Sequence, residues 1–270
     1  MENVKKTILK WYKILNFDPR LDNPFQELLD RTEVDPSVTA YTAILNEDAG
    51  ESCAPTMLYL LEHMHEEYEQ RSLGNERFDE MVRPIKDKIE NAYLKTGTFL
   101  LGDAEWFRLF LAARLFRIGR LWFDIKQINC DVPSKGLVRG DNIVGIHVPA
   151  GSPLLYEDCV KSIKDAKEFI SLHFPDFSYR YMTCISWLLS EKNADLLGEG
   201  SNVLKFATLF EIVSEHKSDN IIRFVFGGGM TRDKLENATP NGRFQRKLKD
   251  AALSGRIFYD RRGVIDITTI

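Results

Sequence analysis

The spacing of the apolar residues changes near Arg117, and this change constrains the fold more than any other feature of the sequence. Upstream of it, apolar side chains recur every three or four residues, as in helices with one buried face. No useful length there alternates with period two. We therefore expect helices over residues 5–17, 25–29, 57–70, 78–94 and 103–116. Pro84 predicts a break or kink in the fourth of these, near Arg83.

Downstream of Arg117, short runs rich in branched and aromatic residues are typical of β-strands. They cover residues 121–125, 143–148, 181–188, 210–213 and 221–226. Helical stretches separate several of them, at residues 156–174, about 194–209 and 243–254. Strands interleaved with helices predict a sheet layer of the α/β or α+β class. We therefore expect a helical domain at residues 1–116 packed on a mixed-sheet domain at residues 117–270.

Charge and cysteine content exclude other classes of protein. The 270 residues carry a net charge of −4, so no overall basic field attracts nucleic acid, and the basic stretch 243–262 is interpreted as a solvated face. The four cysteines lie far apart without a CxxC pair, which predicts no metal site and no disulfide framework. The first residues lack a signal-peptide pattern, and no apolar run approaches the ~18 residues that span a bilayer. We expect a cytoplasmic protein with no membrane partner.

The stretch "GIHVPAGSPLLYEDCVKSIKDAKEFI" is a strand, a sharp turn and then a long helix that starts near Tyr156. Free N–H groups and the positive dipole end make a helix start a site for anions, and Gly151 permits close backbone approach. Against a phosphate site, Pro153 removes one donor, and two acidic residues follow in the first turn. The residues alone leave open whether this turn binds a phosphate or only reverses the chain.

Four further features bear on the chemistry of the chain. His147, on the strand before the turn, is either a hydrogen-bonded core residue or an acid–base group. "CISWLL" places Ser186 in a strand without the G-x-S-x-G elbow, which argues against a serine hydrolase. In "GEGSNVLKF", Ser201 or Asn202 is a helix N-cap, although an asparagine there can also face a ligand. "FGGGM" lacks phosphate-loop spacing and is interpreted as a connector.

Several segments together resemble a known family. "GTFLLGDAEWFRLFLAARLFRIGRLWFDI", "VGIHVPAGSPLLYEDCVKSIKDAKEFISLHFP", "CISWLL" and "GEGSNVLKF" occur in the order seen in bacterial two-domain acyltransferase-like proteins. Those proteins have a helical N-acyltransferase N-terminal domain and a GNAT-like C-terminal domain. The resemblance is good over residues 95–226 and weaker toward both ends.

The resemblance implies a binding site for acyl-CoA. The strand 143–148, the turn 150–154 and the helix from Tyr156 correspond to the splayed strand, amide loop and pyrophosphate-binding helix of GNAT proteins. The strand 181–188 would line the other side of the pantetheine arm. The implied CoA-binding residues are Val148, Ala150, Gly151, Ser152, Leu154, Leu155 and Asn202.

The sequence departs from the family pattern at several positions. The usual loop Q/R-x-x-G-x-G/A is absent, Ala150 stands where relatives have arginine, and Ile185 stands where they have histidine. The aromatic residue nearest to the position of a thiolate-protonating tyrosine is Phe210, which cannot donate a proton.

The resulting hypothesis is an N-acyltransferase that uses acetyl-CoA or another acyl-CoA as co-substrate, without a metal. Its acceptor is a small-molecule or peptide amine that attacks the thioester directly. We expect His147, or a water it orients, to act as base, with Ser186 as a polar contact in the catalytic cleft. The alternative is a GNAT-like binding module without catalysis. Nucleic-acid binding is not favoured, and the oligomeric state is open.

Overall fold

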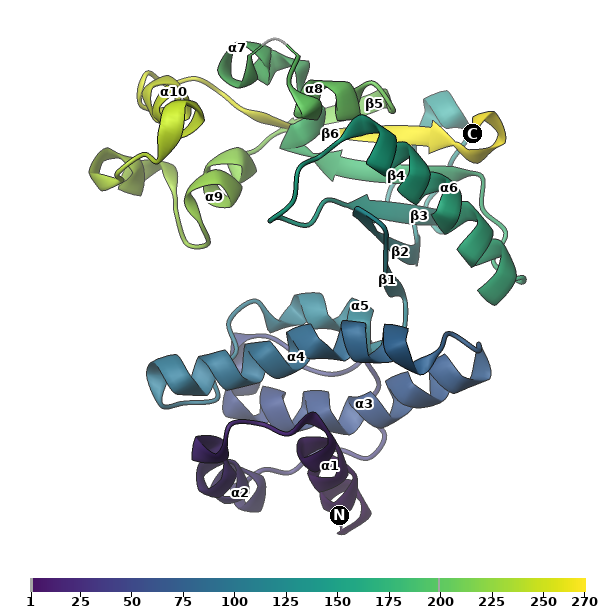
Figure 1. Cartoon of the computed structure of the whole chain (residues 1–270), viewed down its shortest axis with the longest axis vertical. Helices are drawn as coiled ribbons and strands as arrows, with labels where there is room; N and C mark the ends of the chain where they lie inside the picture. Colours follow the sequence, from purple (N-terminus) through teal and green to yellow (C-terminus); the bar gives the residue numbers. More distant parts are fainter. Residues whose placement is uncertain (1, 199) are drawn as a thin grey trace. The chain divides into compact units, whose positions relative to one another are not determined.

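The computed structural model describes residues 2–198 and 200–270. The chain forms two compact units, Met1–Phe116 and Arg117–Ile270, with the division inside the short strand β1 (Leu115–Ile118). Figure 1 shows that helices make up the first unit and that the second contains a sheet with helices around it. None of the described helices is both long enough and apolar enough to cross a membrane.

The first unit confirms the predicted helical region. Its helices are α1 (Glu2–Leu15), α2 (Asp22–Arg31), α3 (Cys53–Gln70), α4 (Asn75–Thr96) and the short α5 (Arg108–Leu111). The apolar residues that repeat along α3 at helical spacing are all buried, namely Met57, Leu58, Leu61, Met64 and Tyr68. The core of this unit is therefore built from the helical faces that the sequence predicts.

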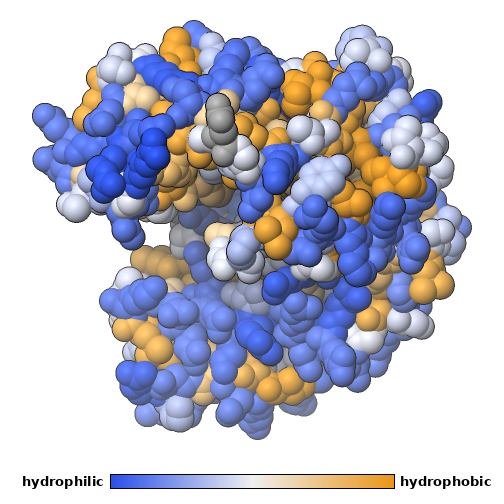
Figure 2. Space-filling model, turned by 45° about the horizontal axis from the view of Figure 1, so that its top comes forward, coloured by the Kyte–Doolittle hydropathy of each residue, from blue (hydrophilic) through white to orange (hydrophobic). Residues whose placement is uncertain are grey.

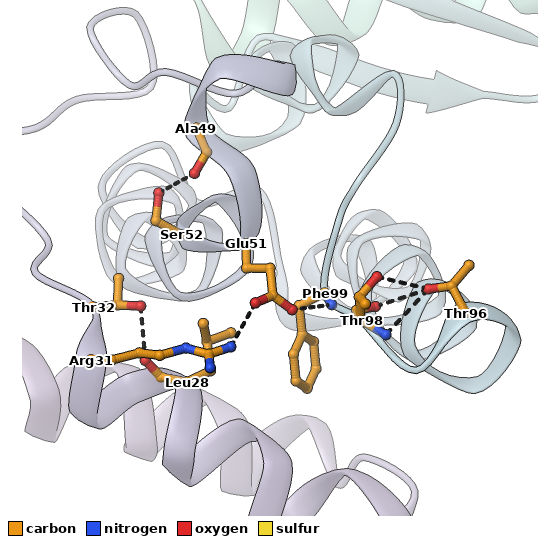
Figure 3. A network of polar contacts seen from close by, with 9 residues as sticks. All are labelled: Leu28, Arg31, Thr32, Ala49, Glu51, Ser52, Thr96, Thr98 and Phe99. Carbon is orange, nitrogen blue, oxygen red and sulfur yellow. Dashed lines mark hydrogen bonds and ion pairs between the residues drawn. The ribbon is translucent and has the colours of Figure 1, made fainter.

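A carboxylate ties three segments of this unit together. Glu51, at the end of the 3₁₀ helix η2 (Glu47–Ser52), accepts a hydrogen bond from Arg31 of α2 at 2.6 Å. Its other oxygen accepts from the backbone N–H of Phe99, just after α4, at 2.9 Å. Figure 3 shows both bonds converging on the one side chain. Because the ring of Phe99 is buried, these bonds fix the chain that leaves α4 against the helical core.

Two predictions in this unit were wrong. Residues 103–116 do not form one helix: η3 (Ala104–Phe107) and α5 end at Ala112, Ala113 is left-handed with φ 49°, and β1 follows. Leu115, Phe116 and Ile118 gain more from burial in a sheet strand than from continuing the helix, so tertiary packing overrides the local pattern. Of the break or kink expected near Arg83, the break is absent, since α4 continues through Pro84.

The second unit has a mixed six-stranded sheet in the order β1-β2-β3-β4-β6-β5. The further strands are β2 (Leu121–Gln127), β3 (Asn142–His147), β4 (Tyr181–Ser186), β5 (Glu211–Lys217) and β6 (Tyr259–Asp266). The helices are α6 (Tyr156–His173), α7 (Ala194–Leu197), α8 (Asn202–Ala207), α9 (Asn220–Phe226) and α10 (Gly242–Leu253). β3 pairs with β4 in parallel, whereas β2 with β3, β4 with β6 and β5 with β6 are antiparallel, which confirms the predicted mixed-sheet class.

Strand register gives the sheet two chemically different faces. Side chains alternate along a strand, and paired residues point to the same side. The first face, the apolar face, carries Phe123, Ile125, Val144, Ile146, Met182 and Cys184. The opposite face, called the polar face below, carries Asp124, Lys126, Gly145, His147, Thr183, Ile185 and Arg262. The polar face therefore concentrates the charged groups of the central strands.

Apolar groups cover part of each face. On the polar face, Ile128, Val132 and Leu137 of the β2–β3 connection pack with Ile143, Tyr181 and Val264. Near the apolar face, a Cβ at Gly263 would lie within about 3 Å of Phe210 and Leu189, so these side chains close that side of β6. Helix α6 contacts β2 and lies along the sheet in Figure 1.

Three predictions in this unit were also wrong. Residues 221–226 are helix α9, because Ile221 and Ile222 pack into a cluster with Leu235, Leu248 and Phe258. The helix expected over 194–209 is interrupted between α7 and α8, where Gly198 has φ 87° and Ser201 caps the second helix. Strand β6 was missed, because its sequence YDRRGVID has four charged residues and does not resemble a core strand.

On the surface view of Figure 2, hydrophobic side chains lie singly or in small groups among hydrophilic ones. Such scattered exposure is normal for a folded domain and marks no extended apolar patch on the face shown.

Candidate functional site

The sheet opens between its two parallel strands. β3 and β4 pair only at Val144 with Met182 and at Gly145 with Thr183. Beyond this point each strand keeps only its outer partner: His147 pairs with Trp122 of β2, and Ile185 pairs with Arg262 of β6. The carboxyl ends of β3 and β4 therefore diverge. Their facing backbone groups, which a continuous sheet would pair, are available to a ligand in this opening.

The turn after β3 is ordered by an arginine that the sequence analysis did not single out. Arg120 donates to the carbonyl oxygens of Pro153 at 2.8 Å, Pro149 at 2.9 Å and Ser152 at 2.7 Å. Its own backbone N–H donates to the hydroxyl of Ser162 in α6 at 2.7 Å. Gly151, at φ 94°, adopts a conformation that favours glycine. One side chain thus gives the turn a defined shape and brings a positive charge to it.

The start of helix α6 lies at the end of this turn and has no side-chain cap. Leu155 is the N-cap residue, and its carbonyl accepts the first helical bond, from Cys159 N–H, at 3.1 Å. Glu157 and Asp158 in the first turn are exposed, and their negative charges partly offset the positive end of the helix dipole. An uncapped start of an 18-residue helix favours an anion.

A buried charge cluster lies on the polar face beside the opening. Asp124 of β2 has a side chain only 2% exposed. Nε2 of His147 lies 2.9 Å from its Oδ1, and Nζ of Lys126 lies 2.8 Å from its Oδ2. Gly145 makes the space for this carboxylate, because a Cβ there would lie 1.7 Å from Oδ1. The glycine on β3 is thus required by the aspartate that faces it across the strand pair.

This cluster sets the tautomer of the neutral histidine ring. Although burial opposes ionisation, the hydrogen bond from His147 and the charge of Lys126 hold the pKa of Asp124 below its usual value. An ionised carboxylate only accepts hydrogen bonds, so Nε2 of His147 must be the donor. In the neutral ring the lone pair is then on Nδ1. A histidine held in this way can act as a base, because the neighbouring carboxylate would stabilise its charged form.

The two residues predicted as catalytic lie on opposite faces. Ser186 is in register with Arg261 and belongs to the apolar face, whereas His147 belongs to the polar face. The Ser186 hydroxyl also caps the 3₁₀ helix η5 (Trp187–Leu189) by accepting from Leu188 N–H at 3.1 Å. The structure therefore does not bring these two side chains together.

Six of the seven residues implied as CoA-binding lie in the segment 148–155, and the seventh is Asn202. Val148 is half-buried, Ala150, Gly151 and Ser152 are exposed, Leu154 is buried, and Leu155 is 43% exposed. Asn202 is the first residue of α8, which contacts α6, and Ser201 is the cap, its hydroxyl accepting from Val203 N–H at 3.2 Å. Asn202 therefore belongs to the surroundings of α6 and not to the turn itself.

Two buried thiols are unsuited to nucleophilic catalysis. Burial raises the pKa of Cys184 to about 12 and that of Cys159 to about 11. Both therefore stay protonated near neutral pH. Neither thiol is therefore a candidate nucleophile of this site.

Asp124 predicts a specific acid dependence of stability. Because its folded-state pKa is below the unfolded value of about 3.9, it stabilises the fold above that pH and loses this contribution as the pH falls further. Denaturant unfolding of the wild type and Asp124→Asn between pH 7 and pH 3 should show a smaller loss of unfolding free energy in the variant. Lys126, His147 and Cys184 surround the carboxylate and are the same in both proteins. Equal losses would contradict the assignment.

Comparison with known proteins identifies the sheet unit. The family described as "GNAT-like C-terminal domain" matches residues 115–265, and no curated protein matches the chain. A solved acyltransferase in complex with decanoyl-CoA and teicoplanin superposes with a TM-score of 0.65 at 22% identity, over 78% of this chain and 65% of that chain. An acyltransferase in complex with decanoyl-CoA gives a TM-score of 0.67 at 22% identity, over 87% and 72%. The chain thus spans about two thirds of the first structure, and the likeness is one of fold.

Proposed function

The chain belongs to the GNAT-like C-terminal domain family, and we propose that it transfers an acyl group from acyl-CoA to an amine. The observation that carries this proposal is the opening between β3 and β4. His147, held by the carboxylate of Asp124, ends β3 at this opening, and the turn and the uncapped start of α6 follow it along the chain. One site therefore combines an anion-binding end with a general base.

We assign the binding of CoA to the turn and helix α6. The first-turn N–H groups of α6 and the backbone around Gly151 would bind the pyrophosphate, next to the charge of Arg120. The backbone of β3 beyond Gly145 has lost its partner on β4 and would bind the amides of the pantetheine arm. Val148, Ala150, Ser152, Leu154 and Leu155 would line this path, with Asn202 near its helical side. Solved acyltransferases of this fold with decanoyl-CoA bound support the assignment.

The reaction follows from the position of His147. The amine nitrogen attacks the thioester carbonyl carbon, a C–N bond forms, and the C–S bond breaks. Nδ1 of His147 takes the proton that the amine loses, while Asp124 stabilises the resulting imidazolium. The thiolate leaves and is protonated to CoA-SH, so the products are an amide and free CoA. No covalent enzyme intermediate is needed, which agrees with the lack of an activated serine or cysteine beside His147.

The acceptor is proposed to be a small-molecule or peptide amine. Teicoplanin in a solved acyltransferase of this fold is consistent with an acceptor of that kind. Exposed apolar side chains beside the opening, Leu155 and Ile185, suit either acetyl-CoA or a longer acyl chain. We also propose a cytoplasmic location, which four free cysteines favour, and a domain boundary between Phe116 and Arg117.

Calorimetric titration with acetyl-CoA and decanoyl-CoA tests this function. We expect both to bind, and Arg120→Ala to weaken binding about 10-fold, because the turn loses three hydrogen bonds and a nearby charge. Arg243→Ala, at an exposed position of α10, is the matched control and should bind normally. Free thiol release with a panel of amines then separates an enzyme from a binding module. Absence of binding at millimolar ligand would refute the proposal.

A further inference from the structure

Two adjacent arginines of β6 have different surroundings. Arg261, with a side chain 11% exposed, pairs with Glu215 of β5 at 3.1 Å and with Glu191 at 3.2 Å. Arg262 is half-buried on the other side of the sheet. Within residues 2–198 and 200–270, no ion pair or hydrogen bond of its guanidinium is found. Arg261 therefore has a structural role in its two ion pairs. The guanidinium donors of Arg262 have no acceptor among the described residues and can bind a ligand.

Three carboxylates of the polar face make contacts with groups other than Arg262. Asp124 is held by Lys126 and His147. Asp260, two residues before Arg262 on the same face, accepts from the side-chain amide of Asn220 at 2.5 Å. Glu211 pairs with Lys135. None of these carboxylates binds the guanidinium of Arg262, although Oδ1 of Asp260 is buried without a hydrogen-bond partner.

The register of β4 with β6 places Arg262 near the opening where acyl transfer is proposed to occur. Its partner across the strand pair is Ile185, the 47% exposed residue that follows the last β3–β4 pair on β4. His147 is on the opposite side of the opening and on the same face. Two strand spacings separate β3 from β6, so the two backbones are about 10 Å apart where the sheet is closed. A small acceptor is therefore long enough to present one group to His147 and another to Arg262.

We propose that Arg262 binds a carboxylate of the acceptor, so that the preferred substrates are amines that carry an acidic group. This inference rests on the proposed acyl transfer. The planar guanidinium forms two parallel hydrogen bonds with a carboxylate, which fixes orientation as well as charge. Binding the acid at β6 would direct the amine across the opening toward Nδ1 of His147. Arg262 acts here as a specificity-determining residue and takes no part in proton transfer.

Matched acceptors test this assignment. We expect kcat/KM for 4-aminobutyrate and 6-aminohexanoate to exceed that for their primary amides by about 10- to 100-fold, the usual value of a charge-assisted pair. In Arg262→Gln the ratio should fall to about one, through loss of activity with the acids alone. Arg262→Lys should keep an intermediate ratio, because it retains the charge without the second hydrogen bond. Arg243→Gln, on the exposed surface of α10, should keep the wild-type ratio.

The results separate this inference from the function on which it rests. Turnover of acid and amide at equal rates, or an effect of Arg262→Gln on the KM for acyl-CoA alone, overturns the inference and leaves acyl transfer intact. If no amine is acylated, calorimetric titration of the same acids and amides into wild type and Arg262→Gln decides the matter. Selective binding of the acids that is lost in the variant supports the carboxylate site, and its absence in the wild type refutes it.

Discussion

His147→Ala is expected to lower kcat for acyl transfer by about 10²- to 10⁴-fold, the usual contribution of a general base. The ring is positioned by a nearly fully buried carboxylate at 2.9 Å, and its removal takes away the group that we propose accepts the amine proton. The dissociation constant for acyl-CoA should stay within about 2-fold, because the turn and the start of α6 do not depend on this side chain. Stopped-flow detection of free thiol and calorimetry measure the two quantities separately.

Chemical rescue gives a second readout of the same residue. Added imidazole is expected to restore part of the variant's activity. His63→Ala, at an exposed position of α3, is the control and should behave as the wild type. A near-normal rate in His147→Ala would show that the base lies elsewhere.

The elements predicted correctly are those whose local pattern agrees with their packing. Residues 57–70 predict α3 because the apolar spacing that specifies the helix is also the face that is buried. Residues 221–226 were assigned to a strand because branched residues favour strands, yet Ile221 and Ile222 are buried as neighbours on one side of a helix. Burial in the cluster around Phe258 decided between the two, and that cluster is assembled from distant segments.

The candidate site could be predicted only in part, for a related reason. The order strand, turn and helix is local, so the turn at Gly151 and His147 were found from the sequence. Arg120 contacts the turn from about 30 residues upstream, and Asp124 meets His147 across 23 residues. These contacts depend on the register of β2 with β3, which a single sequence does not specify. The sequence did contain one indication of these contacts. In "LWFDIKQ", Asp124 and Lys126 are charged residues inside a strand, and strands of a buried sheet rarely contain charged residues.

Gly145→Ala is expected to reduce the free energy of unfolding by about 2–4 kcal/mol, the combined range for overpacking and for separating a buried charge from its partner. The new Cβ would lie 1.7 Å from Oδ1 of Asp124 and 2.4 Å from Nζ of Lys126. The matched control is Gly228→Ala, since nothing lies within 4 Å of a Cβ there and no left-handed backbone is required. Urea unfolding of the two variants measures the difference.

A double-mutant cycle identifies the cause of that loss. Shortening the opposing side chain with Asp124→Ala removes the contact, so Gly145→Ala should cost at least about 1 kcal/mol less in that background than in the wild type. If the two costs simply add, the glycine is required for another reason and the steric account is wrong. Less-than-additive costs would show that Gly145 exists to house the carboxylate that orients His147. The smallest residue of β3 would then belong to the catalytic arrangement as a positioning residue, through Asp124.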